Sequence, residues 1–357
     1  MKNPFHNIIR LVIILLMPVF LHAQMQMASA NRFFEKNDIH KDTKIVIKSD
    51  FSEIKVNTWD KQDFYAQVSI EVRGKNKEKV KRVLDHISIE YTTNDESIVL
   101  QSHFPKNKSG VRYKVIFSIK IPKSNPLVIH SNFSDINVGE TFGPVEIFSD
   151  YSKIILDRLH HEENLIEGDF NSQGKIGFVR GLRLKTEYSD WNIDLGFKVI
   201  ADLEFTSLQI DRLKTLTFDG DYNKIHIKRI KNFDAETDFS TLRIGKVYKM
   251  NLDGDYNKIF VQQLPQQFKM IQIEGDFNEI EIANPRKTPF KFEIFMEYGN
   301  FDIVNDADVH KTEEGTLEKH IKGTYKNAET GGFIRLNLEH SNVKIINNIK
   351  TEENEKN

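Results

Sequence analysis

Apolar and polar residues alternate over short stretches along most of the chain, the period-2 pattern of half-buried β-strands. One eight-residue phrase interrupts this alternation at regular places. It reads: a small or turn residue, an acid, an aromatic, a small polar residue, any residue, then an aliphatic-x-aliphatic pair. The clearest copies begin at Gly220, Gly254 and Gly275, and others begin at Ser49, Ser131, Ser149, Thr186 and Thr237. The pattern predicts an all-β fold.

The aromatic residue of the phrase recurs every 17 to 19 residues from Phe133 to Tyr256, and Phe277 and Tyr298 follow at intervals of 21. Looser copies surround Phe170, Phe205 and Tyr298, and His340 occupies the aromatic slot of another. A period of this size is one rung of a stacked repeat protein and is too short for a propeller blade or a helical repeat. We therefore predict a β-solenoid of 17–21-residue rungs over residues 131–350.

The direction of each side chain follows from its phase, because side chains alternate across a strand. Phe233, Ala235 and Phe239 share one phase, and Leu242 and Ile244 have the other, so we expect a corner at residues 240–241. Since the aromatics share phase with aliphatic residues, we predict that they form a buried structural ladder. Its members are Phe133, Tyr151, Phe170, Tyr188, Phe205, Tyr222, Phe239, Tyr256, Phe277 and Tyr298.

Residues 60–130 break the period and are interpreted as a β-rich insertion with one helix. Strands are expected at 64–72, 87–91, 97–101 and 111–121, and the helix at 75–86, where Val80, Val83 and Leu84 are the apolar residues. A second irregular segment, about 305–332, is expected to be a long rung loop or an extra hairpin, with a binding loop as the alternative.

The N-terminus is typical of a cleavable signal peptide: Lys2 and Arg10, an apolar run from Leu11 to Leu21, then Ala23 at the cleavage site. The run is too short for the roughly 20 residues that span a bilayer. The resulting division is 1–23 signal peptide, 24–44 lead-in, 45–130 β-rich region, 131–350 rungs and 351–357 disordered tail. We expect an exported protein with no stable membrane span after cleavage, located in the periplasm, at the cell surface or outside the cell.

The chain has no cysteine, so stability must come from burial and backbone pairing. Removing the signal peptide changes the formal net charge from −2 to about −4. This mixed, near-neutral composition gives no reason to expect a nucleic-acid partner.

The most regular polar feature is the residue before each aromatic, which is almost always acidic and points outward by alternation. We expect these acids to bond to backbone amides at the corner, and calcium bridging between rungs is the alternative. The column comprises Asp50, Asn132, Asp150, Asp169, Glu187, Glu204, Asp221, Asp238, Asp255, Asp276, Glu297 and Glu339.

Three other features have a structural and a functional interpretation. His160 and His161 beside Glu162 form either a solvated turn or a metal site. Trp59 and Trp191 pack in the core or at its edge, although an exposed Trp191 could stack on a sugar. Phosphate-loop, nucleophile-elbow and metalloprotease motifs are missing from the sequence. We expect no catalytic, cofactor-binding or metal residues.

The chain resembles the putative-adhesin family of exported bacterial β-solenoids over nearly its whole mature length. The resemblance rests on order: Val56-Asn57-Thr58-Trp59-Asp60, a strand, the helix, Ile119-Lys120-Ile121-Pro122, then aromatic-turn-aliphatic rungs. The family's glycine-rich corner is replaced here by Ser, Asn or Thr. The resemblance implies non-catalytic binding or scaffolding at the cell envelope, with an envelope protein or a surface glycan as partner. The alternatives are a polysaccharide-active β-helix enzyme and a self-assembling structural envelope protein.

Overall fold

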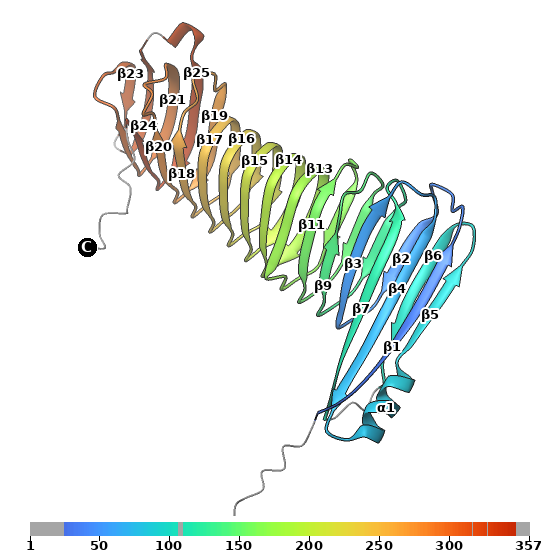
Figure 1. The fold of residues 1–357 in the computed structure, drawn as a ribbon. Coiled ribbons are helices and arrows are strands. Elements are labelled where there is room, and N and C mark those ends of the chain that lie inside the picture. Colours follow the sequence, from blue (N-terminus) through green and yellow to red (C-terminus); the bar gives the residue numbers. More distant parts are fainter. Residues whose placement is uncertain (1–24, 106–109, 316, 327, 348–357) are drawn as a thin grey trace, which may run out of the picture.

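The computed structural model describes residues 25–105, 110–315, 317–326 and 328–347. Within these ranges the protein is all-β, with 26 strands in one open sheet and a single α-helix. The strands lie side by side along one long axis, which gives an elongated molecule (Figure 1). No helix in the described ranges is long and apolar enough to cross a membrane. The predicted signal peptide and the 351–357 tail lie outside these ranges.

The central strands show how the chain builds this shape. Apart from residues at the bend, each residue pairs in parallel with the residue one rung later, as in Leu208 with Ile225 and Ile225 with Leu242. We use the word rung for the segment from one corner aromatic to the next. The strands are β13 (Gln173–Glu187), β14 (Asp190–Glu204), β15 (Ser207–Asp219), β16 (Lys224–Glu236) and β17 (Thr241–Asp253).

Each central strand bends near its middle and buries one set of side chains on both sides of the bend. In β16 these are Ile225, Ile227, Ile230, Phe233 and Ala235, all at most 5 % exposed. The intervals of three residues around Ile230 mark the bend. A rung therefore has two sheet segments that share one apolar interior, and the aliphatic residues of successive rungs stack into continuous buried columns.

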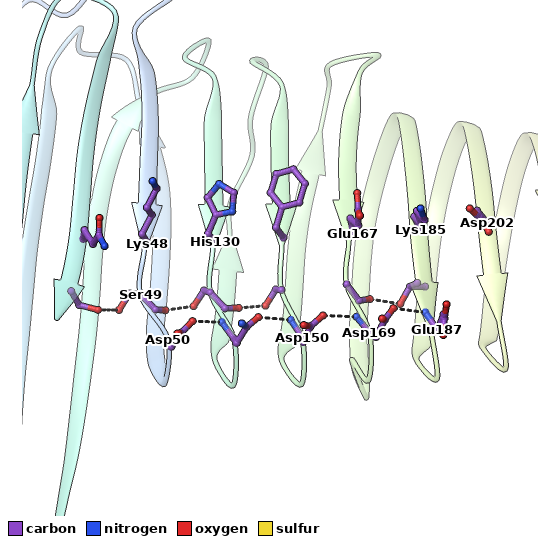
Figure 2. A pocket seen from close by; sticks show the side chains of 18 of the residues that line it. Lys48, Ser49, Asp50, His130, Asp150, Glu167, Asp169, Lys185, Glu187 and Asp202 are labelled. Atoms are coloured by element: carbon purple, nitrogen blue, oxygen red, sulfur yellow. Dashed lines mark hydrogen bonds between the residues drawn. The ribbon is translucent and has the colours of Figure 1, made fainter. Parts of the chain in front are cut away.

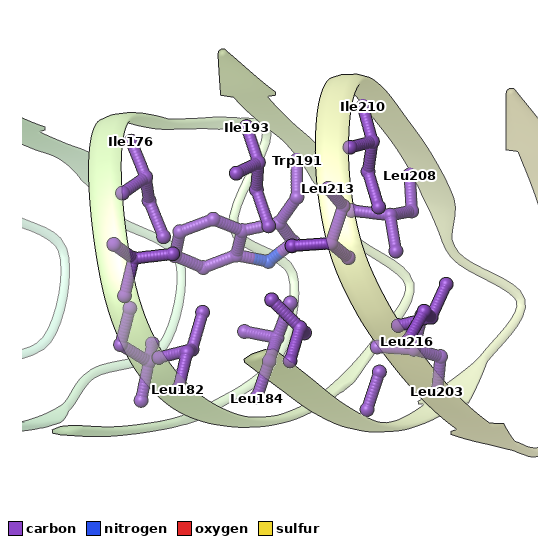
Figure 3. Packing of buried hydrophobic residues seen from close by; sticks show 14 of the residues in the cluster. Ile176, Leu182, Leu184, Trp191, Ile193, Leu203, Leu208, Ile210, Leu213 and Leu216 are labelled. Carbon is purple, nitrogen blue, oxygen red and sulfur yellow. The ribbon is translucent and has the colours of Figure 1, made fainter. Parts of the chain in front are cut away.

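Trp191 is buried in this interior, 3 % exposed, between the aliphatic residues of neighbouring rungs (Figure 3). Its partner in the adjacent strand is Gly174, where an added Cβ would lie 2.3 Å from the indole ring. The rung before Trp191 thus leaves the space that the large ring fills. Of the two interpretations of Trp191, core packing is confirmed, and an exposed sugar-stacking role is wrong.

The N-terminal region continues the same two columns of strands. On one side the order is β5, β6, β2, β8, and on the other it is β1, β4, β7, β3, β9. The insertion is therefore not a separate body: β6 and β7 stack directly on the first rung. The strands are β1 (Gln26–Lys36), β2 (Lys44–Lys48), β3 (Ser52–Trp59), β4 (Phe64–Gly74), β5 (Ser88–Thr93), β6 (Ser97–His103) and β7 (Val111–Pro122).

The predicted helix is confirmed as α1 (Lys77–His86), shorter than expected by two residues at its start. Asn76 caps it, because its side-chain oxygen accepts the amide N–H of Lys79 at 2.9 Å. Val80 and Val83 are its buried residues, and the helix packs against β1 and β4. Its amphipathic pattern was sufficient to predict it.

Short strands connect these regions to the central rungs. They are β8 (Leu127–His130), β9 (Asp135–Val138), β10 (Val145–Phe148), β11 (Lys153–Leu159) and β12 (Asn164–Glu167). All pair in parallel with the neighbouring rungs.

The C-terminal end departs from sequence order. The last rung in sequence, β25 and β26, lies between the rung of β19 and β20 and the rung of β21 and β22. The irregular segment forms the hairpin β23–β24, which pairs antiparallel to β21 and confirms the extra-hairpin interpretation. The elements are β18 (Lys258–Gln263), β19 (Met270–Asp276), β20 (Glu279–Ala283), β21 (Phe290–Glu297), β22 (Asn300–Ile303), β23 (Ala307–Glu314), β24 (Glu318–Tyr325), the 3₁₀ turn Ala328–Thr330, β25 (Gly332–Glu339) and β26 (Asn342–Ile346).

The prediction of a buried aromatic ladder is wrong. All ten side chains are between 43 % and 52 % exposed, and all ten residues have φ between 49° and 58°, in the left-handed region. A positive φ at a single residue turns its side chain away from the face that alternation assigns to it. The corner therefore lies at the aromatic itself, one residue earlier than expected. The ten are Phe133, Tyr151, Phe170, Tyr188, Phe205, Tyr222, Phe239, Tyr256, Phe277 and Tyr298.

Candidate binding surface

The exposed aromatics form one continuous stack along a corner of the molecule. Neighbouring ring centroids are 4.7 to 5.1 Å apart and the ring planes are within 7° of parallel. This spacing is close to the distance between paired strands, about 4.8 Å, so each rung contributes one ring. We call this stack the aromatic ladder.

The ladder is longer than the ten residues predicted for it, and its two further members come from copies of the phrase that the sequence also shows. Phe51 extends it at the N-terminal end, and His340 lies between Phe277 and Tyr298. His340 takes this place because its strand, β25, pairs with β19 on one side and with β21 on the other. Since each ring covers the face of the next, the ladder presents ring edges to solvent, and a ligand meets an apolar ridge.

Inside the corner, small polar residues tie successive rungs together. The buried Asn223 accepts the amide N–H of Thr206 at 2.8 Å and donates to the carbonyl of Leu203 at 2.7 Å. Ser240 in turn accepts the amide N–H of Asn223 at 2.9 Å. These bonds satisfy backbone groups that the sharp turn leaves without a strand partner. The preference for Asn, Ser and Thr after the aromatic is thereby explained.

Outside the corner, the expected acidic column bonds to backbone amides. The amide N–H of Asp238, for example, donates to Oδ1 of Asp221 at 2.8 Å, which ties this acid to the next rung. Seven such bonds measure 2.6 to 2.9 Å. They run from the amides of Asn132, Asp150, Asp169, Glu187, Asp238, Asp255 and Asp276 to the side chains of Asp50, Asn132, Asp150, Asp169, Asp221, Asp238 and Asp255.

An open groove of about 580 Å³ runs across the first rungs beside the acidic column (Figure 2). Lys48, His130, Glu167, Lys185 and Asp202 project from neighbouring strands along its wall (Figure 2), and Phe148 on β10 lies between His130 and Glu167 in the same row. Acids outnumber bases in the groove. Its lining includes Asp50, Asp150, Glu167, Asp169, Glu187, Asp202 and Glu204, against Lys48 and Lys185.

Two groups in the groove have shifted proton affinities. Partial desolvation lowers the pKa of His130, which stacks on Phe148 at 4.8 Å between centroids. Desolvation raises the pKa of Glu204, and the carboxylates of Asp221 and Glu187 raise it further. The groove is therefore a negative, partly desolvated surface at neutral pH, suited to polar or cationic groups.

Both histidines have bonding partners close by in the fold. Nε2 of His160 lies 2.8 Å from a carboxylate oxygen of Glu140, and the ring stacks on Phe142 at 4.3 Å. Nδ1 of His161 accepts the amide N–H of Glu163 at 3.0 Å. Across the residues that the structure describes, no three His, Cys, Asp or Glu side chains are placed to hold a metal ion. The turn interpretation accounts for both histidines.

A second acidic row was missed by the sequence analysis. Asp202, Asp219, Glu236 and Asp253 are exposed and pair in register, one per rung. Each stands two residues before a member of the acidic column. The phrase acid-x-acid-aromatic is visible in the sequence, but the eight-residue phrase starts at the residue between the two acids and therefore leaves the first acid out.

No family model matches the chain, and no curated protein matches it. Several solved structures are similar over most of their length, among them three from Parabacteroides distasonis and Clostridium sporogenes. A putative adhesin from Parabacteroides distasonis is 10% identical, covers 89% of this chain and 97% of its own, and has a TM-score of 0.36. A putative lipid binding protein from the same species is 10% identical, covers 89% and 96%, and has a TM-score of 0.34. A putative cell adhesion protein from Clostridium sporogenes is 11% identical, covers 90% and 100%, and has a TM-score of 0.21. At these values the likeness carries no conclusion about function.

Proposed function

We propose that the protein is an exported, non-catalytic β-solenoid of adhesin-like type that binds at the cell envelope through its aromatic corner. The observation that carries this proposal is the aromatic ladder. Its rings are about half exposed, form one uninterrupted ridge and stand beside the acidic groove. Large contiguous exposed apolar surface on a folded protein typically marks an interaction site.

The backbone at the ladder supports the same proposal. A bulky residue with positive φ is uncommon and costs free energy relative to Gly or Asn. Tyr222 has φ 58° and Phe239 has φ 53°, although neither side chain fills the core. Ring stacking along the ladder offsets part of this cost, by roughly 0.5 to 1.5 kcal/mol per pair. A ridge kept at such cost on the surface is suited to a partner that covers apolar edges, such as an envelope protein or a surface glycan.

The test is a glycan array and a cell-surface binding screen with the mature chain and a triple variant, Tyr188→Asn, Tyr222→Asn and Tyr256→Asn. Asparagine tolerates the left-handed conformation, so the corner is retained while the ridge is interrupted. We expect binding to fall at least about tenfold. The matched control, Tyr→Phe at the same three positions, keeps the rings and should bind as the wild type does. Unchanged binding by a folded Asn variant would reject the proposal.

The enzyme alternative is tested in the same preparation. Turnover of a polysaccharide by the purified protein, abolished by Glu204→Gln, would replace the binding proposal with a catalytic one. Glu204 is the residue to change because the pKa of its carboxyl is raised in the groove, as general acids require.

A further inference from the structure

The corner opposite the aromatic ladder carries a basic ladder in the central rungs. Arg212, Arg229 and Lys246 pair in register on β15, β16 and β17, one per rung. Lys214 and Lys231 are the next residues in sequence after Leu213 and Ile230, the buried residues of the bend. We call these five cations the basic face. Four of them are exposed, and Lys246 is half-buried.

Within the part of the chain that the structure describes, the basic face has no partner. Among the described residues, none of the five cations forms an ion pair, a side-chain hydrogen bond or a ring contact. The nearby carboxylate of Asp211 is bonded to Lys228 at 2.7 Å. Like charges one rung apart repel by about 1 kcal/mol in water, and no contact among the described residues offsets this cost. The acidic column differs, because its side chains bond to backbone amides of the next rung.

The same rungs carry a complementary surface. The second acidic row, Asp202, Asp219, Glu236 and Asp253, has one exposed carboxylate per rung, and among the described residues these side chains form no hydrogen bond or ion pair. We call this row the acid edge. It lies beside the aromatic ladder, at the corner opposite the basic face. Both rows have the same spacing, because both follow the pairing of β14 to β17.

We propose that the basic face binds the acid edge of a second copy of this chain, so that copies associate side by side. Charge and spacing are matched rung for rung, which lets several ion pairs form at once. The ladder rings beside the acid edge, such as Phe205 and Tyr222, supply the apolar and aromatic area that protein interfaces favour next to arginine. Since the two surfaces are different patches on opposite corners, the contact is head-to-tail and does not close into a dimer. Association therefore continues into lateral chains.

Sedimentation velocity of the mature chain tests the proposal. Near 20 mM salt, where charges act over roughly 20 Å, we expect mass to increase with protein concentration up to about 100 µM. Near 500 mM salt, where charges are screened within about 4 Å, the increase should disappear. A wild-type protein that stays monomeric at low salt over this range would overturn the proposal.

Two variants separate the two halves of the contact. One removes charge from the basic face by Arg212→Gln, Arg229→Gln and Lys246→Gln. The other removes charge from the acid edge by Asp202→Asn, Asp219→Asn and Glu236→Gln. Each alone should weaken association at low salt at least about tenfold. An equimolar mixture should form a one-to-one heterodimer and nothing larger, since each variant keeps only one of the two surfaces.

The matched control is Lys75→Gln, Lys77→Gln and Lys81→Gln, which removes three exposed charges near α1 and should leave association unchanged. Circular dichroism confirms that each variant is folded. If the control weakens association as much as the basic-face variant does, net charge is responsible and the proposal fails. Binding of polyglutamate to the basic face of a protein that does not self-associate would assign this surface to an acidic polymer instead. The charge variants leave every ladder ring in place, and the Tyr→Asn screen measures binding to glycans or cells and not association between copies, so either proposal can fail alone.

Discussion

The buried aliphatic columns and the exposed aromatic ladder follow the same rung spacing, yet they lie on opposite sides of the backbone. Ile225 and Leu242 stack in adjacent rungs and are fully enclosed, whereas Tyr222 and Phe239 stack in the same two rungs and are about half exposed. The difference is the sign of one backbone angle at the aromatic. Side-chain type and periodicity alone do not decide which column is the core.

The comparison predicts unequal costs of truncation, and the largest should come from the buried columns. Phe233→Ala removes a side chain that is 1 % exposed inside β16. We expect the free energy of unfolding to fall by about 3 to 5 kcal/mol, because a buried cavity remains. Urea unfolding measures this loss. A decrease below about 1 kcal/mol would mean that the interior relaxes around the missing ring.

Breaking the ion cluster near the C-terminal end should lower the free energy of unfolding by an intermediate amount. Glu293 on β21 contacts Lys322, His320 and Arg335, and the bond to Lys322 contributes most to lowering its pKa from 4.5 to about 2. Glu293→Gln should cost roughly 1 to 2 kcal/mol at pH 7.

The cost of Glu293→Gln should depend on pH in a defined direction. A carboxyl whose pKa is lowered by folding stabilises the protein above its unfolded pKa and loses this effect as pH falls. The difference in melting temperature between Glu293→Gln and wild type should therefore shrink as pH falls from about 4.5 toward 2. A difference that stays constant over this range would show that the ion pairs are not its source.

The ladder should tolerate truncation better than the core does. Tyr222→Asn removes two ring contacts but introduces a residue that accepts φ 58°. We expect a loss of about 1 kcal/mol, well below that of Phe233→Ala. Tyr222→Ala should cost more than Tyr222→Asn, since alanine gains nothing in the left-handed region. If Tyr222→Asn and Phe233→Ala lower the free energy of unfolding equally, the ladder contributes to stability as much as the buried columns do.

Local patterns in the sequence predicted the elements well. Alternation predicted a strand over 111–121, and β7 spans Val111–Pro122. The helix, the hairpin near residue 310 and the outward acidic column were also predicted, because each depends on neighbouring residues. Two features could not be predicted in this way. The first is the positive φ at the aromatics, which reverses the direction of a single side chain. The change of phase in the sequence fits a corner at the aromatic residue as well as a corner just after it.

The order of the last rungs was the second such feature. Spacing suggested that Tyr298 follows Phe277, but His340 lies between them. This order depends on strand pairs more than 40 residues apart in sequence, such as Asn300 with Asn342. The spacing of the repeat shows where each rung begins in the sequence. It does not show the order in which the rungs stack.

The smallest effect is expected at the acidic column, where one exchange separates a hydrogen-bonding role from calcium binding. Asp221→Asn keeps an oxygen that can accept the amide N–H of Asp238. The chain itself uses this exchange, since Asn132 accepts the amide of Asp150 at 2.9 Å in the same slot. We expect a change within about 0.5 kcal/mol, whereas Asp221→Ala should cost roughly 0.5 to 1.5 kcal/mol because the acceptor is lost. Chelator should leave the melting temperature of wild type unchanged. The column supplies one carboxylate per rung, and even with the acid edge the two carboxylates per rung fall short of the six to eight oxygens that calcium takes. A melting point that falls about ten degrees in chelator and returns with calcium would reverse this assignment, and Asp221→Asn would then be as damaging as Asp221→Ala.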